Sequence, residues 1–176
     1  MASQVVKLQG FDVVLAIRLL RPAQTLAALA EELGVVASQV HASLKRLSIA
    51  GLVRPGTRNT NRLALREFIE HGVRYAFPVQ VGKQARGVPT AHSAPLLASQ
   101  IDGVDSFVWP APEGVARING LSVAPLYANA PMLHESSPET YEAVALVDVF
   151  RVGRARERGI ASLALEGLLY AAPSVG

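Results

Sequence analysis

Five polar side chains with the chemistry of base and phosphate contacts lie close together in the first third of the chain. The segment LGVVASQVHASLKRLSIAGLV (33–53) contains Ser38, Gln39, His41, Lys45 and Arg46. Glutamine can form a bidentate pair with adenine, and serine and histidine can donate to or accept from a base edge. Lysine and arginine neutralise phosphates. This order of residues predicts a helix whose N-terminal end reaches the major groove of DNA.

Two short helices separated by a turn would position these side chains. Thr25 is a predicted N-cap and Gly34 a predicted C-cap of the first helix. The second is predicted to start with Ser38 as its cap and to end at Gly51. Its apolar residues recur at i, i+4 and i+7 and should face inward: Val40, Leu44 and Leu47. The polar side chains then face outward.

The turn after the second helix supplies further cations. In LVRPGTRNTN (52–61), Leu52 and Val53 predict a short strand, and Pro55-Gly56 predicts a turn. The expected base contacts are Ser38, Gln39, His41 and Ala42. The expected phosphate contacts are Lys45, Arg46, Arg54, Arg58 and Arg62.

The segment TLAALAEELGVVASQVHASLKRLSIAGLVRP resembles the DNA-binding segment of bacterial winged helix-turn-helix transcriptional regulators of the broad MarR-like type. The matching positions are Leu26, Leu29, Ala30, Leu33, Gly34, Val35, Ser38, Val40, Leu44, Leu47, Gly51, Leu52 and Val53. The resemblance covers about a quarter of the chain, is specific for the fold and leaves the C-terminal half unassigned. It implies sequence-specific regulation of transcription through double-stranded DNA, by a repressor rather than an activator.

Charge is distributed unevenly along the 176 residues. Residues 1–92 contain 12 Lys and Arg against 5 Asp and Glu, a net charge of +7. Residues 93–176 contain 5 Arg against 9 acids, a net charge of −4. A basic half is typical of a nucleic-acid-binding module, and the acidic half indicates another role.

Three segments are predicted along the chain. Residues 1–77 form the winged helix-turn-helix domain, with helices over 8–20 and, capped by Asn61, over 62–77. Residues 78–137 hold 7 of the 11 prolines and form an extended, wrapping segment. Within it, Asn119-Gly120 predicts a β-hairpin over 115–123. Residues 138–171 form a C-terminal helix or helix pair. The expected class is mainly α with a small β part (α+β).

The C-terminal helices are expected to make a homodimer, which would place two recognition helices about 34 Å apart on one face of DNA. The apolar positions of this interface are Val144, Val147, Phe150, Ile160, Leu163 and Leu168. The capping pattern Ser136–Glu139 starts this region, and a break is expected near Gly153 or Gly159.

Other chemistry has little support in the sequence. There is no cysteine, and the four histidines (41, 71, 92 and 134) lack metal-ligand spacing. His92 and Ser93 are adjacent but lack the surroundings of an activated nucleophile. We therefore expect no enzyme, no cofactor and no metal.

Two alternatives stay open. The first is an antitoxin-like or adaptor protein whose acidic C-terminal half binds a protein partner. The second concerns Arg151, Arg154 and Arg158, which share one helical face. They are either solvated, a second phosphate-contacting surface, or a contact to the acidic part of a partner subunit. The apolar run near the N-terminus contains Asp12 and Arg18, which is unlike a signal peptide, and no stretch resembles a membrane helix. The expected location is cytoplasmic.

Overall fold

The computed structural model describes residues 2–23, 25–103 and 105–171. It is mainly helical with one small sheet, as the sequence predicted. In chain order the elements are α1 (Gly10–Arg18), α2 (Leu26–Leu33), α3 (Ala37–Ala50), α4 (Arg62–His71), α5 (Val73–Ala76), β1 (Gln84–Pro89), η1 (Ala91–Ser93), α6 (Pro95–Ala98), β2 (Phe107–Pro110), β3 (Ile118–Ser122), η2 (Ala130–Met132), α7 (Leu133–Ser136), α8 (Pro138–Val152) and α9 (Ala155–Tyr170).

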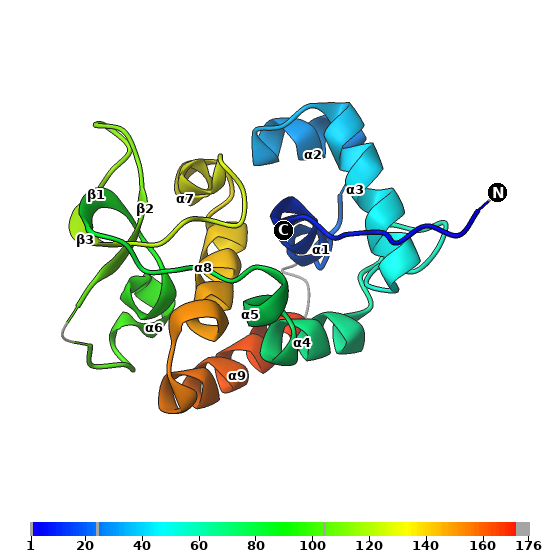
Figure 1. Ribbon diagram of the computed structural model, residues 1–176. Helices are drawn as coiled ribbons and strands as arrows, with labels where there is room; N and C mark the ends of the chain where they lie inside the picture. The colour runs from blue at the N-terminus through cyan, green and yellow to red at the C-terminus, as the bar shows by residue number, and fades with distance from the viewer. Residues whose placement is uncertain (1, 24, 104, 172–176) are drawn as a thin grey trace.

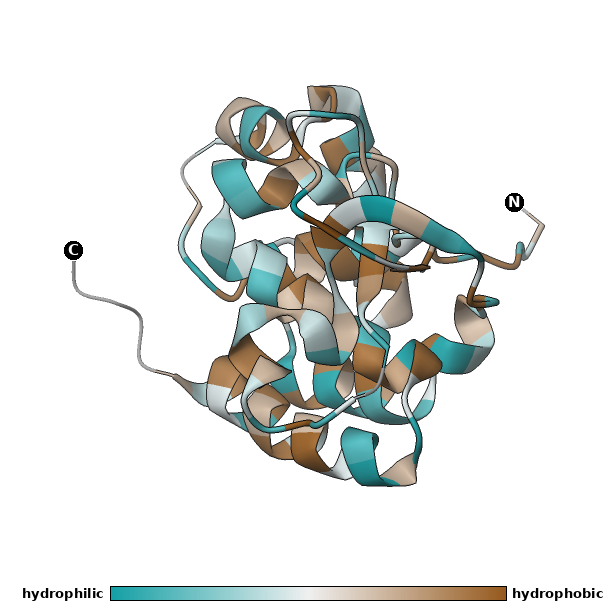
Figure 2. Ribbon diagram, turned by 90° about the vertical axis from the view of Figure 1, so that its left-hand side faces the viewer, coloured by the Kyte–Doolittle hydropathy of each residue, from teal (hydrophilic) through white to brown (hydrophobic). Residues whose placement is uncertain are grey.

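Helix α8 lies at the centre of the molecule. The sheet lies on one side of it and α1 to α3 lie on the other (Figure 1). All residues from Ala143 to Phe150 are buried, and α8 contacts α1, α5, α7 and α9. Hydrophobic positions gather along the central helices in Figure 2. One hydrophobic core therefore joins residues from all three segments predicted from the sequence.

The three strands pair in a closed arrangement. β1 runs antiparallel to both β2 and β3, and β2 and β3 pair in parallel. A Cβ atom on Gly87 would lie 2.0 Å from the carbonyl oxygen of Trp109, so this close packing needs glycine.

The predicted hairpin over 115–123 is wrong. Asn119 and Gly120 lie inside the single strand β3 and pair with β1. A Cβ on Gly120 would lie 2.7 Å from the carbonyl oxygen of Ser106. The glycine thus permits close approach of a neighbouring segment, which is the other common role of glycine in a strand.

Several predicted helix boundaries are confirmed. The Oγ1 atom of Thr25 accepts a hydrogen bond from the amide of Ala28 at 3.0 Å, and the Asn61 side chain caps α4. Gly34 and Gly51 end α2 and α3 with φ of 68° and 76°. The break predicted near Gly153 separates α8 from α9. None of the helices in the described part of the chain is long and apolar enough to cross a membrane.

Three boundary predictions are wrong. α3 begins one residue before Ser38, and Val36 occupies its N-cap position. The helix predicted over 62–77 is divided into α4 and α5 at Gly72. In addition, α8 is preceded by Ser137 rather than capped by Ser136, which belongs to α7.

Candidate nucleic-acid interface

The outward face of α3 carries the predicted polar side chains. Ser38, His41 and Lys45, at i, i+3 and i+7, are exposed, while Gln39 and Ala42 beside them are partly buried. The opposite face is formed by the buried residues Val40, Ser43 and Leu47. Of the four residues expected to contact bases, Ser38 and His41 are therefore exposed near the N-terminal end of α3, and Gln39 and Ala42 are partly accessible.

The N-terminal turn of α3 has no side-chain cap and no acidic residue. An uncapped helix N-terminus presents unpaired N–H groups and the positive end of the helix dipole. Ser38 does not cap the helix and is exposed, while the amide of Gln39 donates to the carbonyl of Val36 at 3.0 Å. Such an end is suited to an anion such as a DNA phosphate.

Helix α3 is fastened to α1 by a buried carboxylate. Asp12 is fully buried, and its two oxygens accept bonds from Arg46 Nε and Nη2, both at 2.8 Å. Ser43 Oγ donates to the same carboxylate at 2.6 Å. The backbone amide of Gln9 donates to it as well, which closes the first turn of α1. The network fixes the rotation of α3 about its own axis and so determines which face is exposed.

The prediction that Arg46 contacts phosphate is wrong. Its side chain is only 18% exposed and forms a bidentate ion pair with Asp12. The hydrogen bonds that Arg46 donates to Asp12, opposed by burial and aided by the charge of the carboxylate, raise the pKa of Arg46. Arg46 is part of the support of the helix, and Lys45 is the exposed cation beside it.

The turn after α3 is short. One antiparallel bridge joins Val53 to Thr60, and the amide of Arg54 donates to the carbonyl of Asn59 at 2.9 Å. Thr60 Oγ1 donates to the carbonyl of Ala16, which attaches the base of the turn to α1. Arg54 and Arg58 lie in the exposed part of the turn.

Arg62 has a different role from the predicted phosphate contact. Its Nε donates to the carbonyl of Leu169 at 2.6 Å and its Nη2 to the carbonyl of Leu20 at 3.4 Å. These carbonyls lie in the last turn of α9 and just beyond α1. A guanidinium at this position donates to carbonyls that have no partner within their helix. Its positive charge also interacts favourably with the negative C-terminal ends of the two helix dipoles.

The C-terminal half braces the turn between α2 and α3. Tyr127 Oη donates to the carbonyl of Leu33 at 2.9 Å, and Asn129 Nδ2 donates to the carbonyl of Gly34. Burial, together with the nearby charge of Glu32, raises the pKa of Tyr127. These contacts span more than 90 residues of sequence, so no local pattern indicated them.

The predicted dimer interface is wrong at three of its six positions. Val144, Val147 and Phe150 are buried within the single chain, because α8 is the central helix. Ile160 and Leu168 are partly buried against the same core. Only Leu163, with 74% of its surface exposed, points away from the chain.

In the second arginine cluster, Arg151 and Arg158 form hydrogen bonds within the chain. Arg151 donates to Asp148 Oδ1 at 2.7 Å and to the carbonyls of Phe77 and Ala124. Arg158 donates to the carbonyl of Gly153 at 2.6 Å, whereas Arg154 is exposed. The cluster is therefore no continuous phosphate-binding face.

Asp148 is fully buried beneath the sheet. Its Oδ2 accepts bonds from Thr90 Oγ1 at 2.7 Å and Trp109 Nε1 at 2.6 Å. Burial raises the pKa of Asp148, and the charge and hydrogen bond of Arg151, with the Thr90 and Trp109 donors, oppose this shift. Like Asp12, it was not recognised from the sequence as a buried carboxylate.

His92 and Ser93 have separate partners. His92 Nε2 lies 3.1 Å from the carbonyl oxygen of Asp105, and Ser93 Oγ accepts a hydrogen bond from the amide of Phe107. Within the described residues, no group of three His, Asp or Glu side chains could hold a metal ion.

No protein-family model, curated protein or solved structure matches this chain.

Proposed function

We propose that the protein is a sequence-specific double-stranded DNA-binding transcriptional regulator, with α2 and α3 as a helix-turn-helix and the 52–61 turn as a reduced wing. One observation carries the proposal. The N-terminal turn of α3 is uncapped, free of acidic residues and continuous with the exposed Ser38, His41 and Lys45. A helix with this end fits the major groove, where amides and lysine meet phosphates and polar side chains meet base edges.

The rigid support of α3 favours the same function. Base recognition needs side chains held in a fixed position, and the Asp12 network and the Tyr127 and Asn129 contacts fix both the helix and the turn before it. Repression by a bound protein that blocks access to a promoter follows from the resemblance described above.

Selection of bound sequences from a random duplex pool tests this proposal. The wild-type protein should enrich a defined motif. Gln39→Ala should lose preference at one base position, because a bidentate contact contributes on the order of 1–3 kcal/mol of discrimination. Gln84→Ala, which removes the same side chain from an exposed position in β1, is the matched control and should keep the full motif. Failure of the wild type to enrich any motif would contradict the proposal.

A second copy of the chain is the proposed partner on the α9 face. Leu163 and Tyr170 on α9, with Leu63 on α4, are 74%, 53% and 71% exposed. A contiguous patch of exposed apolar side chains would mark a protein contact, with a second copy or, for an adaptor, with another protein. Sedimentation of wild type and Leu163→Asp distinguishes self-association from binding of another protein. A wild-type dimer that becomes a monomer in Leu163→Asp supports self-association. A wild-type monomer contradicts it.

A further inference from the structure

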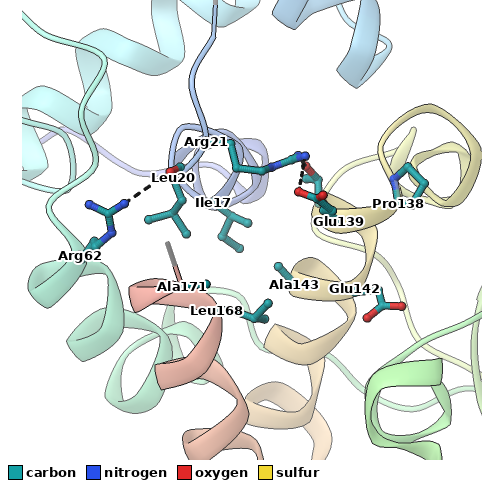
Figure 3. Close-up of a pocket in the computed structure, with 11 residues that line it drawn as sticks. Ile17, Leu20, Arg21, Arg62, Pro138, Glu139, Glu142, Ala143, Leu168 and Ala171 are labelled. Atoms are coloured by element: carbon teal, nitrogen blue, oxygen red, sulfur yellow. Dashed lines mark hydrogen bonds and ion pairs between the residues drawn. The ribbon is translucent and has the colours of Figure 1, made fainter. Parts of the chain in front are cut away.

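A cavity of about 450 Å³ lies where the end of α1, the first turns of α8 and the end of α9 meet (Figure 3). Its apolar wall is formed by Ile17, Leu20, Ala143 and Leu168. The volume is in the range of small-molecule sites. Aliphatic groups line it, and no aromatic ring is among the described lining residues, so the wall favours an alkyl chain over a stacked ring.

Arg21 is the cation at the rim of this cavity. Its Nη2 donates to Thr140 Oγ1 at 2.7 Å and to Ser137 Oγ at 3.2 Å, so two hydroxyls hold the guanidinium in place. Its Nη1 donates to Glu139 Oε2 at 2.6 Å. Figure 3 shows this pair above the apolar wall.

The bond between Arg21 and Glu139 is the exchangeable one. The Glu139 side chain is 61% exposed and the Arg21 side chain 35% exposed. Exposed ion pairs contribute little to stability, so another carboxylate can take the position of Glu139 without strain. Arg62, the other cation of the lining, is bonded to the carbonyls of Leu20 and Leu169 instead.

The charge of the lining limits the ligand to one negative charge. Glu139 and Glu142 both line the cavity with Arg21 and Arg62. Glu32 Oε1 also lies 3.8 Å from Arg21 Nη2. A phosphate or a dicarboxylate would bring two negative charges next to these acids, whereas a monocarboxylate brings one.

We propose that this cavity binds an aliphatic monocarboxylate, with the carboxylate on Arg21 in place of Glu139 and the alkyl chain on Ile17, Leu20, Ala143 and Leu168. The binding is noncovalent. It does not depend on DNA, so its test is independent of the function proposed above.

Calorimetric titration of the full chain with butanoate, hexanoate and octanoate, below their aggregation limits, tests the proposal. Each added methylene should tighten binding about fourfold until the cavity is filled. Octanol should bind more weakly than octanoate, because it lacks the charge that Arg21 recognises. Affinity that is undetectable, or independent of chain length, would overturn the proposal.

Two variants of the same ion pair separate recognition from structural damage. Arg21→Gln should weaken octanoate binding about tenfold or more, and Glu139→Gln should strengthen it severalfold by removing the competing carboxylate. Both variants break the same bond, so a merely structural effect would move the two affinities in the same direction. That result, in variants shown to be folded by circular dichroism, would also overturn the proposal.

Discussion

Each half of the molecule contains a fully buried aspartate bonded to an arginine, but the two pairs connect different elements of the fold. Asp12 of α1 accepts from Arg46 and Ser43 of α3 and so joins two helices that are separate in sequence. Asp148 accepts from Arg151 of its own helix. Its remaining partners, Thr90 and Trp109, come from the loop after β1 and from β2.

The difference shows what each carboxylate organises. The first pair lies beneath a helix whose other face is exposed and polar, so it orients a surface. The second pair lies beneath a sheet and within the central helix, so it holds the core of the C-terminal half together. Buried ion pairs are tolerated only when hydrogen bonds satisfy both charges, and both pairs meet this condition.

The largest expected effect is on the second pair. Asp148→Asn leaves Arg151, whose side chain is 4% exposed, without its counter-charge. We expect the free energy of unfolding to fall by about 3–5 kcal/mol, measured by urea denaturation. DNA affinity at temperatures where the variant is folded should be unchanged. Lost affinity in a folded variant would show that the two regions are coupled.

The two neighbouring cations on α3, Arg46 and Lys45, should contribute very different amounts to the free energy of unfolding. Arg46→Ala leaves Asp12 buried and unpaired, and should lower the free energy of unfolding by about 2–3 kcal/mol. Lys45→Ala removes an exposed side chain and should change it by less than about 0.5 kcal/mol. Thermal or urea unfolding of both variants measures the contrast. Equal stabilities would remove Arg46 from the support of α3.

Tyr141, which packs on Trp109 in the C-terminal half, should have a smaller and pH-dependent effect on the free energy of unfolding. Burial raises the pKa of Tyr141 from 10.0 to about 12, and its hydroxyl donates to the carbonyl of Pro89. A raised pKa means that the unfolded chain loses the proton first, so stability falls as the pH rises above 10. Relative to Tyr141→Phe, wild type should lose about 1.4 kcal/mol per pH unit up to about pH 12.

Urea unfolding of wild type and Tyr141→Phe between pH 8 and 11 checks this. The stability advantage of wild type should be constant below pH 9.5 and shrink above it. A constant difference over the whole range would contradict a buried phenol in the folded state.

Local signals in the sequence were sufficient for much of the first 71 residues. Thr25, Gly34, Gly51 and Asn61 end or begin helices through bonds to their immediate neighbours, so their residue types alone identify these positions. The outward face of α3 follows from the period of its apolar residues in the same way.

The errors concern contacts between distant residues. Arg46 was assigned to phosphate because its partner is 34 residues away. An aspartate in the apolar run FDVVLAI needs hydrogen-bond donors or a counter-charge once it is buried, but the run does not show which residue supplies them. Val144 and Phe150 were assigned to a dimer because an apolar helix face does not reveal whether the same chain or another covers it. Gly120 was assigned to a turn because a crowded strand and a turn both require glycine.

The central claim is that the α3 face binds DNA, and salt-dependent binding tests it most directly. Fluorescence anisotropy with the duplex upstream of the protein's own gene, and with a scrambled duplex, should be measured at several salt concentrations for wild type, Lys45→Ala and Lys83→Ala. Lys83 is an exposed lysine next to β1, on the sheet side of α8, and is the matched control for the lost charge. We expect tighter binding to the native duplex, and a salt slope reduced by about 0.9 in Lys45→Ala but not in Lys83→Ala. Weak and equal binding to both duplexes, or equal slopes in all three proteins, would contradict this claim.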